Sequence, residues 1–87
     1  MEVHKEIWMK LVEELNELST VLIQHHNKPN KDLSNKIIEE FGDVLFQIQR
    51  VKEILPEDVI NEIDKRIAWK KAKYELKQRF NTQWEED

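Results

Sequence analysis

Four acidic residues have a type and a spacing suited to binding a divalent cation. Glu14 and Glu17 are three residues apart, and so are Glu40 and Asp43. On a helix, side chains at this spacing lie on one face about one turn apart. Carboxylates with no His or Cys nearby favour hard cations such as Mg²⁺ or Mn²⁺, which keep several waters and often bind substrate phosphates. The two pairs therefore predict a metal site for a phosphorylated ligand.

Each pair stands in the same relation to the apolar stripe of its helix. At about 100° per residue, Glu14 lies roughly 40° from Leu18, and Glu40 lies roughly 40° from Val44. The second acid of each pair lies about 60° further out, so we expect the first to border the core. Two carboxylates about 4 Å apart repel by about 4 kcal/mol at an effective dielectric constant near 20, unless a cation lies between them. The alternative is that all four are ordinary solvated charges.

The apolar pattern predicts an all-α fold. Apolar residues recur at steps of three and four over residues 7–22 and 37–55, and a third helix is expected over 57–80. We expect the first two helices to form an antiparallel hairpin, followed by the third. The stripe of the second helix is broad, which predicts a bundle completed by homo-oligomerisation. The two stripes are Ile7, Trp8, Leu11, Val12, Leu15, Leu18 and Leu22, and Ile37, Phe41, Val44, Ile48, Val51 and Leu55.

Polar residues and two prolines mark the joints between the helices. The polar stretch over 25–31 predicts a loop, after which Asp32 or Ser34 can cap the second helix. Pro56 ends that helix, because the residue before a proline avoids the α region. Gly42 lies within it, where glycine costs about 1 kcal/mol relative to Ala. Close helix approach, room for a ligand or simple tolerance would explain this glycine.

Composition restricts the chain to one small domain. With 87 residues and a mass of 10.6 kDa, we expect one helical domain over 1–80 and a polar tail over 81–87. The absence of cysteine and the single glycine exclude disulfides, thiolate zinc sites and Gly-rich phosphate loops. No apolar run exceeds three residues, so we expect no membrane span, no signal peptide and a cytoplasmic location.

The charge is unevenly distributed along the chain. The net charge of −4 argues against nucleic acid as the main partner. Residues 64–81 hold seven bases and two acids, a local charge of +5, and the rest of the chain carries −9. The acid excess therefore coincides with the two predicted acidic helices.

Two sequence segments resemble a known enzyme family. They are Glu13-Glu14-Leu15-Asn16-Glu17-Leu18 and Glu39-Glu40-Phe41-Gly42-Asp43-Val44-Leu45-Phe46. They resemble the E-x-x-E and E-x-x-D half-motifs of the all-α nucleoside triphosphate pyrophosphohydrolases, most closely the MazG-like branch, over roughly residues 5–75. The resemblance implies Mg²⁺-dependent hydrolysis of a nucleoside triphosphate, expected to be a deoxynucleotide, to the monophosphate and pyrophosphate.

The resemblance also implies roles for single residues. Glu14, Glu17, Glu40 and Asp43 would be the metal ligands, and one of them would orient or deprotonate the attacking water. The family forms homodimers or dimers of dimers, which is the assembly expected here.

Basic residues would bind the substrate phosphates. Lys36 matches a basic position of MazG-like proteins, and Lys70, Lys73 and Tyr74 fall in a segment like the family's K-x-x-x-N-x-x-K-Y. Lys70 stands where Asn is usual, and Glu75 stands where proline often follows. The alternative for Lys70 is that its stem packs on apolar surface while its charge stays in water.

Two other functions remain open at the level of the sequence. A non-catalytic helical adaptor or oligomerisation module would keep the apolar stripes and make the acids ordinary surface charges. A phosphoribosyl-nucleotide pyrophosphohydrolase of the same fold would keep the metal site, although the Gly-Asp-x-Leu-Phe context favours the MazG-like branch.

Overall fold

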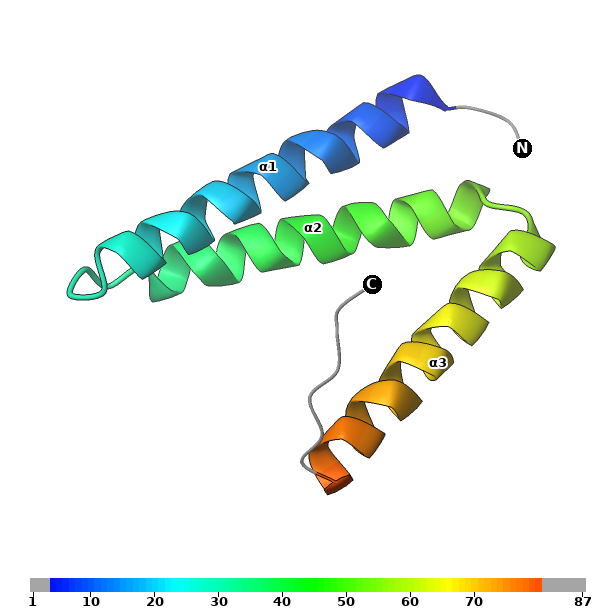
Figure 1. Cartoon of the computed structure of the whole chain (residues 1–87). Coiled ribbons are helices and arrows are strands. Elements are labelled where there is room, and N and C mark those ends of the chain that lie inside the picture. The colour runs from blue at the N-terminus through cyan, green and yellow to red at the C-terminus, as the bar shows by residue number, and fades with distance from the viewer. Residues whose placement is uncertain (1–3, 81–87) are drawn as a thin grey trace. The chain divides into compact units, whose positions relative to one another are not determined.

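The computed structural model of the chain describes residues 4–80, and over these residues it contains three helices and no strand. The helices are α1 (Lys5–Asn27), α2 (Ser34–Ile54) and α3 (Glu57–Phe80) (Figure 1). The prediction of an all-helical chain is therefore confirmed. The predicted tail over 81–87 lies outside the described residues.

Helix α1 is longer than the polar sequence after Leu22 suggested. It continues through His25 and His26 to Asn27, so the predicted loop over 25–31 begins only at Lys28. His25 and His26 lie in the last turn, where a cationic side chain interacts favourably with the negative end of the helix dipole. Lys28 has left the helical region at φ −130° and ψ 67°, as expected for a residue that precedes proline.

The boundaries of α2 follow the predicted local chemistry in part. The N-cap residue of α2 is Leu33, which makes no side-chain capping hydrogen bond, so neither Asp32 nor Ser34 occupies the predicted cap position. The Ser34 backbone N–H nevertheless donates to Asp32 Oδ1 at 3.0 Å, so Asp32 satisfies one free N–H of the first turn. At the other end, Leu55 is extended at φ −80° and ψ 143°, and Pro56 follows it. Helix α3 then begins with Glu57 and Asp58 in its first turn, where negative charge is favourable.

The chain divides into two units, Met1–Leu55 and Pro56–Asp87. In the first unit α1 and α2 lie side by side and run in opposite directions (Figure 1). We call these two helices the α1–α2 pair. Within the described residues, the second unit contains helix α3. The prediction of one domain over residues 1–80 stays a prediction.

The contact between α1 and α2 follows a narrower seam than the predicted stripes. Buried and half-buried positions recur at alternating steps of three and four in both helices, the spacing of a coiled-coil seam. The apolar residues buried in this seam are Val21, Val44 and Val51, and Val21 was not among the predicted stripe residues. The seam positions are Ile7, Leu11, Glu14, Leu18 and Val21 in α1, Leu33 immediately before α2, and Ile37, Glu40, Val44, Gln47, Val51 and Ile54 in α2.

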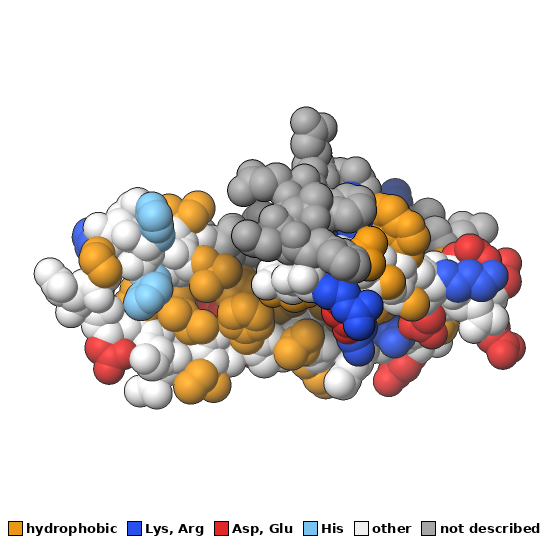
Figure 2. All heavy atoms as spheres, turned by 60° about the horizontal axis from the view of Figure 1, so that its bottom comes forward, with side chains coloured by type: hydrophobic (Ala, Val, Ile, Leu, Met, Phe, Trp, Pro, Cys, Tyr) orange, Lys and Arg blue, Asp and Glu red, His pale blue; other side chains and the backbone are white. Residues whose placement is uncertain are grey.

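Several predicted core residues are exposed, because one neighbouring helix covers only a narrow strip of an amphipathic face. Of the predicted stripes, the exposed members are Val12, Leu15, Leu22, Phe41 and Ile48. On the remaining surface of α2, Ile38, Leu45 and Phe46 are exposed as well. Figure 2 shows exposed hydrophobic side chains (orange) at several places on the surface in that view. The α1–α2 pair thus leaves much apolar surface uncovered.

Among the described helices, none is both long enough and apolar enough to pass through a membrane.

Candidate metal centre

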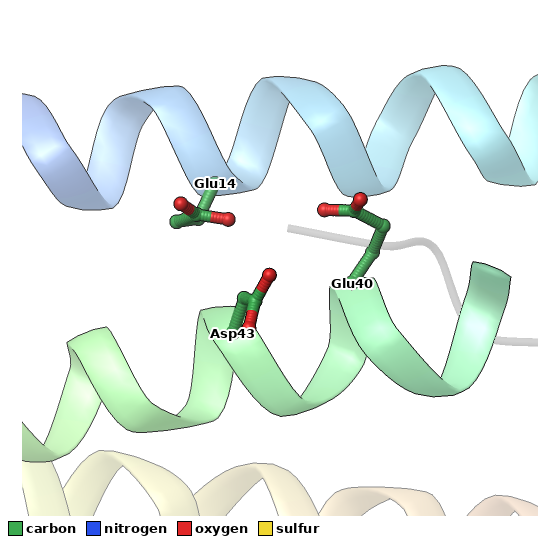
Figure 3. Close-up of side chains that lie close together, drawn as sticks. All are labelled: Glu14, Glu40 and Asp43. Atoms are coloured by element: carbon green, nitrogen blue, oxygen red, sulfur yellow. The ribbon is translucent and has the colours of Figure 1, made fainter. Parts of the chain in front are cut away.

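Three of the four predicted carboxylates meet between α1 and α2. Glu14 of α1 and Glu40 and Asp43 of α2 each offer one carboxylate oxygen, and these three oxygens lie within 4.8 Å of one another. In Figure 3 all three side chains project into the space between the two helices. We call this group the carboxylate cluster.

Two members of the cluster are core residues of the helix pair. Glu40 is 2% exposed and Glu14 is 6% exposed, and these values are close to the 5% of the neighbouring core residue Val44. The sequence predicted that these acids border the core, but they occupy seam positions within it. Burying a carboxylate is unfavourable unless it is neutralised or paired. The structure therefore places charge where folding alone would favour an apolar side chain.

A lysine pairs with one oxygen of each buried glutamate. Lys10 Nζ lies 3.4 Å from Glu14 Oε1, and Lys36 Nζ lies 3.2 Å from Glu40 Oε1. Hydrogen bonds to Glu13 and Glu14 raise the pKa of Lys10. A hydrogen bond to Glu40 is the largest cause that raises the pKa of Lys36. Both lysines are therefore charged at neutral pH, and each neutralises part of a buried carboxylate.

The second oxygen of each buried glutamate has no partner among residues 4–80. Glu14 Oε2 and Glu40 Oε2 are buried and accept no hydrogen bond from the residues that the structure describes. An ionised carboxylate has only acceptor oxygens, so such an atom needs a donor or a cation beside it. Three carboxylates from two helices are a hard-oxygen donor set of the kind that binds divalent cations. The cluster could hold a metal ion.

Glu17, the fourth predicted ligand, lies beside the cluster and is not among its three members. Its side chain is exposed. The negative charge of Glu14 is the largest cause that raises the pKa of Glu17, and the neighbouring carboxylate of Glu40 raises it further. Glu17 is therefore close enough to interact electrostatically with both buried carboxylates. Its role as a metal ligand stays a prediction.

A pocket of about 390 Å³ opens next to Glu17 and Glu40. The amide side chains of Asn16 and Gln24 contribute to its polar lining, and Lys36 belongs to its wall. Its full lining is Asn16, Glu17, Thr20, Val21, Gln24, Lys36 and Glu40. Of the cluster members Glu40 lines this pocket, which is large enough for part of a small ligand.

The other predicted substrate-binding residues belong to the second unit. In α3, Arg66, Lys70 and Lys73 surround the Trp69 ring, with cation-to-centroid distances of 4.3, 5.9 and 5.1 Å. Such contacts stabilise a cation beside an aromatic face. Lys70, Lys73 and the exposed Tyr74 stay predicted phosphate-binding residues.

Sequence reasoning missed two residues near or within the seam. Lys10 precedes Glu14 by four residues, as Lys36 precedes Glu40, so the repeated spacing K-x-x-E-E could have identified it. Gln47 is buried and its Oε1 has no partner among residues 4–80. Its position seven residues after Glu40 could have placed it in the seam.

Comparison with models of protein families, with curated proteins and with solved structures finds no match to the chain. The resemblance to the MazG-like branch stays a prediction that rests on the two sequence segments.

Proposed function

We propose that the protein is a Mg²⁺-dependent nucleoside triphosphate pyrophosphohydrolase, with Mn²⁺ as a possible substitute. The reaction would convert a nucleoside triphosphate, expected to be a deoxynucleotide, to the monophosphate and pyrophosphate. The observation that carries the proposal is the carboxylate cluster, in which Glu14 and Glu40 are buried and each keeps one oxygen without a partner in the described part of the chain. Buried polar atoms in folded proteins nearly always have a partner, so these two oxygens require a bound cation or a water molecule beside them.

The chain's own residues would hold and orient the reactants. Glu14, Glu40 and Asp43, joined by Glu17, would hold the cation. When bound, this cation would offset charge on the phosphoryl oxygens and lower the pKa of a bound water. Water attacks the α-phosphorus, the bond to the bridging oxygen breaks, and pyrophosphate leaves. The proton released from the water passes to an exposed carboxylate of the site, Asp43 or Glu17, and then to solvent.

Basic residues would neutralise the triphosphate, and the presence of Lys36 in the wall of the pocket supports this role for Lys36. Lys70, Lys73 and Tyr74 would contribute from α3. Under this proposal α1 and α2 form an antiparallel hairpin, and α3 follows as the third helix. A homodimer or a dimer of dimers completes the bundle. The exposed apolar residues Ile38, Leu45 and Phe46 support such an assembly.

The test is pyrophosphate release from each dNTP and NTP by the purified full chain, with and without Mg²⁺. We expect at least one nucleotide to yield pyrophosphate and monophosphate only when the metal is present. Glu40→Gln, purified in the same way, controls for a contaminating phosphatase and should be inactive. If no nucleotide yields pyrophosphate and Mg²⁺ does not raise the melting temperature, the proposed enzyme function is wrong.

A non-catalytic oligomerisation module is the competing function. It would account for the exposed apolar residues of α2. It gives no reason for two buried glutamates with unpartnered oxygens, so the enzyme explains more of the structure.

A further inference from the structure

The carboxylate cluster is flanked by two lysines in equivalent positions. Both helices contain the sequence K-x-x-E-E, with Lys10, Glu13 and Glu14 in α1 and Lys36, Glu39 and Glu40 in α2. Each lysine contacts its exposed glutamate as well as its buried one, at 3.3 Å for Lys10–Glu13 and 3.6 Å for Lys36–Glu39. Each of the two helices therefore contains the same three-residue arrangement, a lysine that contacts one exposed and one buried glutamate.

The opposite directions of α1 and α2 put the lysines at opposite ends of the cluster. Four residues of helix rise about 6 Å, so each lysine precedes its buried glutamate by about one turn. Figure 3 shows Glu14 on the side of the cluster nearer the start of α1, and Glu40 on the side nearer the start of α2. Lys10 and Lys36 consequently lie beyond these glutamates in opposite directions.

The charge of this region is unfavourable for an anionic ligand unless cations are present. The six acids Glu13, Glu14, Glu17, Glu39, Glu40 and Asp43 face two lysines, which leaves a net formal charge of −4. A divalent cation would reduce this charge by half. The two lysines are then the nearby side chains of the pair that can attract phosphate oxygens.

Both lysines can reach a ligand without leaving the helix surface. The side chains are 48% exposed for Lys10 and 52% exposed for Lys36. An ammonium group has three donors, and its present carboxylate contacts, at 3.2 to 3.6 Å, are long for charge-assisted hydrogen bonds. A phosphate in the adjacent solvent can replace such contacts with shorter ones.

We propose that Lys10 and Lys36 are a pair of phosphate-binding residues, one at each end of the carboxylate cluster. The ligand that fits them is an elongated polyanion, a chain of linked phosphates that lies along the α1–α2 pair across the metal. Lys36 lines the pocket, so any nucleoside would lie at the Lys36 end and the terminal phosphate at the Lys10 end. The inference rests on the proposed function for the nucleotide, but not for the phosphate chain.

The experiment measures binding of inorganic tripolyphosphate and of orthophosphate to the full chain in the presence of Mg²⁺, by titration calorimetry. Lys10→Met and Lys36→Met keep the aliphatic stem and remove the charge. Each should weaken tripolyphosphate binding about tenfold, since one charge-assisted contact is lost. Lys52→Met removes a lysine from the last turn of α2 and should leave binding unchanged.

Mg²⁺ binding in the absence of phosphate separates a ligand contact from a structural role. Lys10→Met should bind Mg²⁺ alone within about threefold of the unmodified chain, although it has lost tripolyphosphate affinity. Wild-type affinity of Lys10→Met for tripolyphosphate, or an equal loss of Mg²⁺ and tripolyphosphate binding, would overturn the proposal. The lysine would then serve only to neutralise Glu14.

A second variant covers the case in which Lys10→Met does not fold. Glu13→Gln leaves the Lys10–Glu14 contact and removes the exposed competitor for the lysine, so tripolyphosphate should bind two- to threefold more tightly. Unchanged or weaker binding would contradict the proposal.

If tripolyphosphate binds through both lysines but no nucleotide yields pyrophosphate, the phosphate site stands and the proposed hydrolysis fails.

Discussion

Residues 10–17 of α1 and residues 36–43 of α2 are two versions of the same arrangement. Each begins with a lysine, continues to an exposed and then a buried glutamate, and ends with a second acid one turn later. The buried glutamates have the same environment, with one oxygen paired to lysine and the other without a partner among the described residues. The two helices thus contribute equivalent halves of one centre.

The halves differ at their last two positions. Asp43 belongs to the carboxylate cluster, whereas its counterpart Glu17 lies beside it at the pocket. Gly42, next to Asp43, corresponds to Asn16, which also lines the pocket. The comparison teaches that equal spacing along two helices does not give equal roles. Glu17 lines the pocket, and Asp43 completes the cluster.

The largest expected effect tests the equivalence of the buried glutamates. Glu14→Gln and Glu40→Gln should each reduce Mg²⁺ affinity at least a hundredfold, because each removes a charged ligand from a site with few alternatives. Mn²⁺ binding followed by electron paramagnetic resonance would measure this loss. The exposed neighbours provide matched controls, since Glu13→Gln and Glu39→Gln remove the same charge one residue away. Equal losses in the controls would show a general charge effect in place of ligation.

A smaller effect should separate Asp43 from Glu17. Asp43→Asn should weaken metal binding about a hundredfold and Glu17→Gln only about tenfold, because Asp43 lies in the cluster and Glu17 beside it. Without metal, Glu17→Gln should raise the melting temperature, since repulsion from Glu14 is removed. Metal titration and thermal unfolding of both variants check this. An equal loss in the two variants would restore Glu17 to full equivalence with Asp43.

The sequence was sufficient for the helices and for the identity of the acids. Apolar periodicity predicted all three helices, and Pro56 predicted the end of α2 one residue from its observed position at Ile54. The sequence was not sufficient to predict which residues are buried. A hydropathy stripe treats Glu14 and Glu40 as border residues, but the seam between two helices is set by packing geometry, which here includes polar side chains. The burial of Glu40 can therefore be seen only when the packing of α1 against α2 is known.

The sequence also could not settle why Gly42 is a glycine. A Cβ built at Gly42 meets nothing within 4 Å, so no close approach inside the described residues requires it. Gly42→Ala should therefore stabilise α2 by about 0.5–1 kcal/mol, measured by chemical unfolding at low protein concentration. If instead a second copy approaches α2 here, the same variant should dissociate the oligomer in sedimentation experiments, whereas Asn16→Ala should not. Destabilisation at low concentration would contradict the open environment of the glycine.

The smallest expected effect concerns Asp32, which lies shortly before residues 36–43 and accepts a hydrogen bond from the Ser34 N–H. This hydrogen bond holds the pKa of Asp32 below its ordinary value of 3.8. The carboxylate therefore stabilises the fold above that value, and the stabilisation is lost as the pH falls through the lowered pKa. Asp32→Asn should unfold at a slightly lower temperature than the unmodified chain at pH 7, and the difference should shrink toward zero in acid. A difference that persists after the pH has fallen below the lowered pKa of Asp32 would mean that Asp32 acts through its shape and not through its charge, because both side chains are neutral there.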